Sequence, residues 1–303
     1  MQKIKDIVLY WFGILKASIG YWLRGDALIH AGALAFFTLF SIAPVVILAV
    51  QVIGLVMSTD AAMQQIMSLL EDNVGAEAAQ AVAEAVARTR ITDGGLLPTI
   101  IGVGAMLLGA TTVFAQMQRS LNNIWDIAPR PSRNTLFALI KNRLLSLTVV
   151  LSIGFVMMVS LLLSVITQAL MVFAQDWLPV PGMFMVVVET LVSVTVITLL
   201  FATIFKVLPD AILSWRDVLL GALVTALLFI LGRFLIALYL SHTATASTYG
   251  AAGSLVLLLL WVYYSSLILL FGAAVTRARA EARNSTVRPR ATAVRVRRVL
   301  EDQ

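Results

Sequence analysis

Residues 216–240 form an almost wholly apolar run, yet one arginine, Arg233, stands inside it. A run of about twenty-five residues is long enough to cross the hydrocarbon core of a bilayer as a helix. A guanidinium keeps its proton, and its charge is costly in hydrocarbon, so it must face protein or water and find a partner. The run therefore predicts a membrane-spanning helix, and it makes the partner of Arg233 the first functional question.

The composition is typical of an integral membrane protein of the all-α class. Of 303 residues, 60% are hydrophobic and 13% are charged, whereas about a quarter of the residues in a soluble domain are charged. The chain has no cysteine and two histidines, which excludes disulfides, thiolate nucleophiles and most zinc-hydrolase sites. The sequence therefore predicts no catalytic residue, no metal site and no cofactor.

Six segments are predicted to cross the membrane as helices, which makes the chain a polytopic membrane protein with a six-helix transmembrane domain over residues 25–277. Each segment is predominantly apolar and about twenty residues or longer, as a spanning helix requires. The predicted spans are residues 27–57, 97–118, 144–173, 183–205, 216–240 and 249–276.

Three other segments are predicted to lie outside the bilayer. Residues 1–24 place apolar residues at helical spacing and favour an amphipathic helix on the membrane surface. A signal peptide is the rival for this segment, but no small-residue cleavage site follows it. Residues 59–93 turn polar and acidic and predict a small helical cap outside the cell membrane, whereas 278–303 form an arginine-rich tail that we expect to be flexible.

The basic residues predict the orientation of the chain. An even number of spans puts both ends on one side, and nearly all the lysines and arginines outside the spans lie in the segments on that side. The opposite side holds Arg88 and Arg90. Because positive residues are enriched in cytoplasmic loops, both termini are predicted to be cytoplasmic.

Small residues and one proline mark positions where helices are expected to bend or approach closely. Pro44 stands inside the first span, where it allows a break. Gly102 and Gly109 fall on one face of the second span and would let another helix come near. Gly250 and Gly253, at the start of the sixth span, are further candidates for close packing or a kink.

The fourth predicted span contains Glu189, a candidate partner for Arg233. Measured from the outer side at 1.5 Å per residue, Glu189 lies about 10 Å into its helix and Arg233 about 12 Å into the next. Consecutive antiparallel spans are usually neighbours, and Gln51 of the first span falls at a similar depth. Two interpretations stay open: a structural salt bridge that fixes helix register, or a binding point for an anionic group in a transport route.

Asp26 and His30 form a second polar pair, at the inner end of the first span. They are four residues apart and therefore share one face of a helix. A histidine beside a carboxylate can relay protons. An interfacial hydrogen bond at the start of a helix is the more frequent explanation of such a pair, and both remain open.

Several stretches together resemble the YihY/BrkB family of bacterial inner-membrane proteins over roughly residues 20–280. They are the runs Ala31-Gly-Ala-Leu-Ala-Phe-Phe to Pro44, Gln118-Arg-Ser-Leu-Asn-Asn-Ile-Trp125, Val207-Leu-Pro-Asp210 and Tyr249-Gly-Ala-Ala-Gly-Ser-Leu-Val256. The resemblance implies six transmembrane helices in a bacterial cytoplasmic membrane. Family members have been called ribonuclease BN, a label generally regarded as misassigned, and others are associated with serum resistance and with envelope lipid handling.

The chain departs from the family pattern near the end of the last span. Members usually carry a glutamate after the sequence Gly-Ala there, and this chain has Ala274. A mechanism that needs that carboxylate would therefore have to draw it from another position in this protein.

Three functions follow from these features. The first is a transporter or permeation protein for a lipid or an amphipathic or anionic solute, involved in envelope maintenance. The second is a structural membrane protein whose cap docks an envelope partner, and the third, which we disfavour, is an enzyme acting on RNA or lipid. The expected partners are membrane lipids, with anionic headgroups at the basic tail; the sequence allows a homo-oligomer and predicts no nucleic-acid partner.

Overall fold

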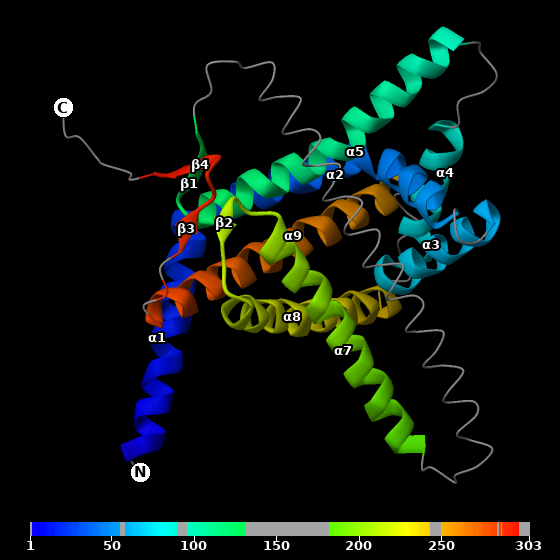
Figure 1. The fold of residues 1–303 in the computed structure, drawn as a ribbon. Coiled ribbons are helices and arrows are strands. Elements are labelled where there is room, and N and C mark those ends of the chain that lie inside the picture. Colours follow the sequence, from blue (N-terminus) through cyan, green and yellow to red (C-terminus); the bar gives the residue numbers. More distant parts are fainter. Residues whose placement is uncertain are drawn as a thin grey trace.

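The computed structural model describes residues 2–54, 58–89, 96–130, 182–242, 250–283, 285 and 287–296. Helices make up nearly all of this part of the chain, as expected for the all-α class (Figure 1). They are α1 Gln2–Arg24, α2 Ala27–Ile53, α3 Thr59–Val74, α4 Ala76–Thr89, α5 Leu96–Ile124, α7 Gly182–Val207, α8 Trp215–His242 and α9 Gly250–Ala282. Four short strands accompany them: β1 Ile127–Pro129, β2 Ala211–Ile212, β3 Arg288–Pro289 and β4 Ala293–Arg295.

Four of the described helices are long and apolar enough to cross a membrane. Their spanning stretches are Ala27–Gln51, Thr190–Val207, Trp215–Ile236 and Leu255–Ala282, and they coincide with the first, fourth, fifth and sixth predicted spans. The second predicted span lies within α5, and the third, 144–173, falls outside the described residues. The protein is therefore a multi-pass helical membrane protein, while the number six stays a prediction.

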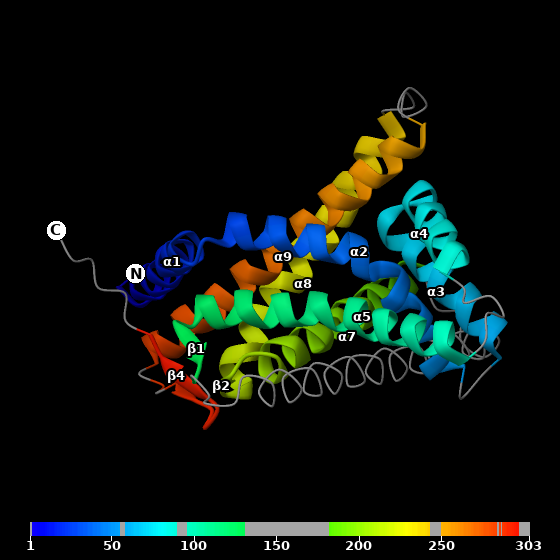
Figure 2. The ribbon, with the colours of Figure 1, turned by 90° about the horizontal axis from the view of Figure 1, so that it is seen from above.

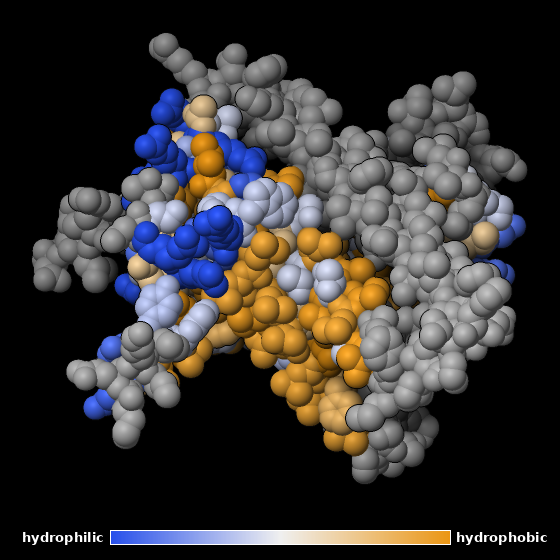
Figure 3. All heavy atoms as spheres, turned by 60° about the horizontal axis from the view of Figure 1, so that its bottom comes forward, coloured by the Kyte–Doolittle hydropathy of each residue, from blue (hydrophilic) through white to orange (hydrophobic). Residues whose placement is uncertain are grey.

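The outer face of α8 has the character of a surface in contact with lipid. Leu219, Leu223, Leu227 and Leu231 follow one another every four residues, and all four side chains are exposed. Figure 3 shows a broad hydrophobic surface. Most of the hydrophilic residues in this view lie on the side that carries α1 and the strands in Figure 1, and some lie at the opposite edge. A contiguous apolar surface of this kind is unfavourable in water and is explained by a bilayer.

Helices α8 and α9 meet through small residues. A Cβ atom added at Gly272 would lie 1.8 Å from Thr225 Oγ1 and 2.9 Å from the carbonyl oxygen of Gly221. A Cβ added at Gly221 would lie 2.3 Å from the carbonyl oxygen of Gly272. Lipid tails are as apolar as leucine, so close van der Waals packing of this type holds membrane helices together.

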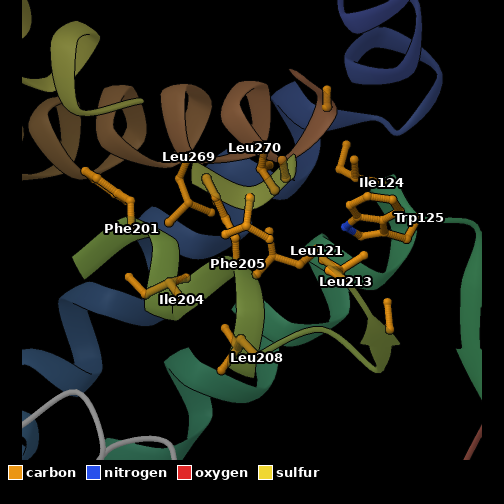
Figure 4. Packing of buried hydrophobic residues seen from close by; sticks show 14 of the residues in the cluster. Leu121, Ile124, Trp125, Phe201, Ile204, Phe205, Leu208, Leu213, Leu269 and Leu270 are labelled. Carbon is orange, nitrogen blue, oxygen red and sulfur yellow. The ribbon is translucent and has the colours of Figure 1, made fainter. Parts of the chain in front are cut away.

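The main buried cluster joins α5, α7, α8 and α9 (Figure 4). Phe205 of α7 is 1% exposed and lies between Leu121 of α5 and Leu270 of α9, both fully buried. Ala222 of α8 and Ala273 of α9 complete the contact between the helices. This cluster packs beneath the loops at one end of the molecule, where most of the polar contacts of the described residues lie.

Helices α3 and α4 pack at the other end. They contact each other and α2, and α4 also contacts α9. Val82 and Val86 of α4 are buried with Val46 and Val50 of α2. Figures 1 and 2 both place α3 and α4 at the end opposite the strands. The helices predicted for the cap therefore exist, and their position outside the bilayer stays a prediction.

Helix α1 packs along α9, with Ile14 and Ser18 buried. Its other side exposes large apolar residues such as Trp11, Phe12 and Leu15. An apolar side of this size suits the predicted place of α1 at the membrane surface.

The basic tail has more structure than the sequence suggested. Helix α9 continues to Ala282, and β4 then pairs antiparallel with β1 while β3 pairs with β2. Where we expected a flexible segment from residue 278 onward, residues 288–296 hold the loops after α5 and α7. The arginines of the tail favoured the prediction of a solvated segment. Strand pairing is made by backbone N–H and C=O groups, so the pattern of charged side chains does not predict it.

Candidate functional site

Arg233 lies on the side of α8 that faces the protein, and its side chain is half-buried. It is one turn from Phe229 and Ile236, both of which pack against the cluster containing Trp261 of α9. Among the ion pairs and hydrogen bonds of the described residues, none involves the Arg233 guanidinium. The structure thus places a permanent charge beside an aromatic wall within a membrane-spanning helix.

That wall is rigid. The ring centroids of Phe229 and Trp261 are 5.2 Å apart, and those of Trp261 and Tyr264 are 6.2 Å apart. The Tyr264 hydroxyl donates to the carbonyl oxygen of Leu228 at 2.7 Å. A Cβ atom added at Gly232 would lie 2.1 Å from the Tyr264 ring, so the glycine beside Arg233 is what allows the ring to lie against α8.

The two expected neighbours of Arg233 lie on α7 and α2. Helix α7, which carries Glu189, packs against α8, but the side chain of Glu189 lies outside the described part of the chain. The Glu189 and Arg233 pair therefore stays a prediction. Gln51 lies near the end of α2 with an exposed side chain.

Pro44 of α2 and Gly109 of α5, two positions expected to shape helix packing, lie against each other. Helix α2 is continuous through Pro44, and a Cβ atom added at Gly109 of α5 would lie 3.0 Å from Pro44 Cγ. The glycine thus lets α5 approach the proline ring. Gly102 lies in α5, and Gly250 and Gly253 lie in the first turn of α9, at positions whose surroundings fall outside the described part.

His30 is held by α5. Its Nδ1 lies 3.2 Å from Ser120 Oγ, and its Nε2 lies 3.0 Å from Asn123 Nδ2. Asn123 Nδ2 also donates to the carbonyl oxygen of Gly25 at 2.8 Å. Asp26 is exposed, has a φ of 49°, and its carbonyl oxygen accepts from the His30 amide. The spacing of Asp26 and His30 on one helix gave no sign of these partners on another helix.

Asn122 and Asp210 form a clamp between α5 and the loop after α7. Asn122 Nδ2 donates to Asp210 Oδ2, and the Asp210 amide donates back to Asn122 Oδ1, both at 2.8 Å. Gln118 Nε2 adds a third bond to Asp210 Oδ1 at 3.3 Å. We did not single out these residues as a site, although all three lie in the stretches that carry the family resemblance.

Arg277 of α9 is the centre of a second network. Its Nη2 lies 2.7 Å from Asp126 Oδ2 and its Nε 3.0 Å from Glu281 Oε1, while Nη1 donates to the Ile124 carbonyl oxygen at 2.5 Å. The guanidinium also lies over the Tyr21 ring, 4.2 Å from its centroid. A single cation thus ties α1 and the loop after α5 to α9.

The Tyr21 hydroxyl donates to Glu281. Burial raises the pKa of Tyr21 above its ordinary value, and the hydrogen bond to the Glu281 carboxylate raises the pKa further. Tyr21 is therefore a neutral donor at physiological pH.

Two more contacts complete this end of the molecule, which we call the polar end and define by Asn122, Asp126, Asp210, Asp217 and Arg277. Asp217 in the first turn of α8 is buried, and its Oδ1 lies 3.3 Å from Arg283 Nη1. The Arg290 guanidinium donates to the Val207 carbonyl oxygen at 3.1 Å. Asp217 at the start of α8 and Arg290 at the end of α7 both interact favourably with the dipole of the helix that they meet.

Comparison with known protein families gives a match that includes the stretches that meet at the polar end. A family model described as "Virulence factor BrkB" matches residues 21–297. The chain belongs to the BrkB family. A UPF0761 membrane protein of Psychromonas ingrahamii is 27% identical over 282 residues, which is 91% of this chain and 89% of that protein.

Two other relatives of this BrkB-family chain differ from each other in name. YfkH of Bacillus subtilis, whose name describes it only as ribonuclease-like, is 29% identical over 245 residues, covering 79% of this chain and 85% of YfkH. A UPF0761 membrane protein of Azotobacter vinelandii is 30% identical over 274 residues, or 90% of this chain and 63% of that protein. No solved structure matches.

Position 274 is where this chain departs from the glutamate that the BrkB resemblance led us to expect. Ala274 is fully buried in the main cluster, next to Ala273. An ionised carboxylate at this place would need a buried partner. The Ala274 side chain instead packs within the main cluster, so α9 is apolar at this position.

Proposed function

We propose that this BrkB-family protein is a transporter or permeation protein of the bacterial inner membrane that handles a lipid or an amphipathic, anionic solute and serves envelope maintenance. The observation that supports this proposal is Arg233, a half-buried cation within the spanning stretch Trp215–Ile236 that has no ion pair among the described residues. Ionisable residues within membrane spans commonly mark the path of a substrate or ion.

The surroundings of Arg233 suit an amphipathic ligand. A guanidinium binds phosphate and carboxylate groups through paired hydrogen bonds. The aromatic rings of Phe229 and Trp261 lie on the protein side of this region, and exposed leucines, including Leu231, cover the outer side of α8. A lipid could therefore bring its headgroup to Arg233 while its chains stay in the bilayer.

The proposal includes an orientation. Arg233 lies sixteen residues beyond Asp217 on α8, which corresponds to roughly 24 Å along a helix. The polar end and Arg233 therefore belong to opposite halves of the membrane. With the basic segments inside, the polar end faces the cytoplasm and Arg233 belongs to the outer half.

The test compares two arginines of the same helix in proteoliposomes. Arg233→Gln should slow the transbilayer movement of fluorescently labelled phosphatidylglycerol by about tenfold or more, as expected when one charge-assisted bond is lost. Arg216→Gln, at an exposed position at the start of α8, should leave the rate within about twofold. If Arg233→Gln folds normally and transports at the wild-type rate, Arg233 has no part in transport.

A structural role is the second candidate, and the anchoring of α3 and α4 favours it. These helices bury Ile66, Val82 and Val86 against the rest of the protein and expose Gln65 and Gln80. Such a platform suits a partner with a polar surface. A chain lacking residues 59–89 that still transports lipid but no longer supports envelope integrity would favour this role.

An enzyme acting on RNA is disfavoured, although the name of YfkH contains the term ribonuclease-like. A zinc-dependent hydrolase needs several histidine and carboxylate ligands at short range, and His30, one of two histidines in the chain, has both ring nitrogens near Ser120 and Asn123. Hydrolysis of RNA by the pure protein with added divalent metal, abolished by His30→Ala, would overturn this view.

A further inference from the structure

The paired tail borders an open hollow of about 400 Å³ at the end of α9. It is lined by Arg277 and Glu281 of α9, by Trp125, and by Ser285, Val287 and Arg295 of the tail. Small-molecule sites are commonly about 300–1,000 Å³, mostly apolar, with a few polar groups that orient the ligand. The hollow has this size, but its lining is more polar, because charged or polar residues make up half of it.

The two arginines of the hollow differ in what they already bind. Arg277 is committed to Asp126, Glu281 and the Ile124 carbonyl oxygen. Arg295 is exposed, and no hydrogen bond or ion pair of its side chain is present among the residues that the structure describes. The position of Arg295 is nevertheless defined, because its backbone lies opposite Ile127 in the pairing of β4 with β1.

The hollow lies beside the end of the candidate spanning stretch of α9. The spanning stretch of α9 ends at Ala282, one residue after Glu281, which binds Tyr21 of the predicted surface helix α1. Ser285 comes three residues after Ala282, and its amide donates to the Ala280 carbonyl oxygen at 2.9 Å, which holds the Ser285 backbone at the helix end. Both lipid headgroups and phosphorylated compounds in solution can reach such a place.

We propose that this hollow is a binding site for an anionic phosphate group, with Arg295 as the principal cation. The guanidinium fork matches two phosphate oxygens, and the Ser285 hydroxyl supplies another donor. Trp125 and Val287 contact the less polar part of the ligand. The site is at the opposite end of the molecule from Arg233 and does not depend on the transport proposal.

The test uses the absence of cysteine from the chain. Ser285→Cys introduces a single thiol in the hollow of the full-length protein, and Thr292→Cys introduces one at an exposed tail position outside it. The rate of reaction with a water-soluble maleimide is measured in phosphatidylcholine vesicles, in an equal mixture of phosphatidylcholine and phosphatidylglycerol, and in phosphatidylcholine vesicles with added glycerol phosphate. Potassium chloride at the same ionic strength is the blank.

Protection of the Ser285→Cys thiol, without protection of the Thr292→Cys thiol, is the expected result. Protection by phosphatidylglycerol alone identifies a lipid headgroup, and protection by glycerol phosphate identifies a ligand from solution. Adding Arg295→Gln should raise the half-protecting concentration by roughly tenfold or more. Adding Arg288→Gln, an exposed cation of β3 that does not line the hollow, should change it less than about twofold.

Equal reactivity under all three conditions overturns the proposal, and so does protection that survives Arg295→Gln. The rate of an Ala293→Cys thiol in the Arg295→Gln background checks that the tail strands remain paired, because Ala293 is buried in β4 and unpairing would raise its rate. Transport of labelled lipid by the same variants separates this site from Arg233: Arg295→Gln should leave transport within about twofold.

Discussion

Among the described residues, the charges of the polar end are paired with each other, whereas Arg233 has no ion pair. At the polar end, Asp126 lies against Arg277 and Asp217 against Arg283. Arg233 lies in the apolar spanning stretch of α8, and no ion pair of the described residues includes it. A charge that is satisfied within the protein stabilises one arrangement, whereas a cation without such a partner is available to a ligand.

The two regions also differ in how their helices meet. Beneath the polar end, α8 and α9 approach through Gly221 and Gly272 with almost no space between them. Beside Arg233, the contact is made by rings, with Tyr264 lying on Gly232. The polar end is therefore expected to be the more stable part of the fold, and Gly272→Ala and Arg277→Gln measure that stability.

The largest effect is expected from Gly272→Ala. The new methyl group would collide with Thr225 Oγ1 and the Gly221 carbonyl oxygen, and backbone has little room to move, so we expect a loss of about 3 kcal/mol in the free energy of unfolding. Reversible unfolding in detergent measures it. Gly32→Ala, where nothing lies within 4 Å of the new atom, is the matched control and should stabilise α2 by up to about 1 kcal/mol.

The second largest effect is expected from Arg277→Gln, which should lower the free energy of unfolding by about 2 kcal/mol. The Arg277 side chain is 12% exposed and its acids, Asp126 and Glu281, are 36% and 39% exposed, so the loss should fall below that of a fully buried pair, which is about 3–5 kcal/mol. The same unfolding assay applies. A loss under about 0.5 kcal/mol would mean that the polar end is not the stable region.

Asn122→Ala is expected to cost about 1.5 kcal/mol in the free energy of unfolding, because it removes both bonds of the clamp and leaves the Asp210 carboxylate bonded to Gln118 alone among the described residues. Asn123→Ala is the comparison at the next position, where the partners are His30 and Gly25. Hydrogen exchange of the loop after α7 should speed up in the first variant and stay unchanged in the second. The reverse pattern would contradict the role of the clamp.

Tyr21→Phe should cost about 1 kcal/mol near neutral pH, since the hydroxyl donates to Glu281. The folded pKa of Tyr21 is raised by burial and by Glu281, so its contribution is fully present below the ordinary value of about 10 and is lost as the pH rises through the folded pKa. The difference between wild type and Tyr21→Phe should therefore shrink above about pH 10. A difference that grows with pH would show that the shift has the opposite sign.

The smallest effect on stability is expected from Arg233→Gln. Removing a half-buried charge that has no described partner should change the free energy of unfolding by less than about 0.5 kcal/mol, or even increase it. Unfolding of Glu189→Gln and of the double variant completes a cycle. A loss comparable to that of Arg277→Gln, coupled to Glu189, would erase the contrast between the two regions and make the pair structural.

The sequence by itself determined the membrane class and the positions of the helices. Hydropathy and length are local properties, so 183–205 and 216–240 correspond closely to α7 and α8, and 249–276 to most of α9. The motif stretches also identified the family correctly, because they are read position by position. Arg233 stood out for the same reason: it is an arginine among apolar neighbours in the chain.

The tertiary structure decided which side chains meet. Asn122 and Asp210 are 88 positions apart and Tyr21 and Glu281 are 260 apart, and no local pattern links such residues. The pairing of β4 with β1 was hidden in a segment whose arginines suggested a solvated tail. Partners across the fold depend on how helix faces pack and where loops end, and these are properties of the whole chain rather than of any one segment.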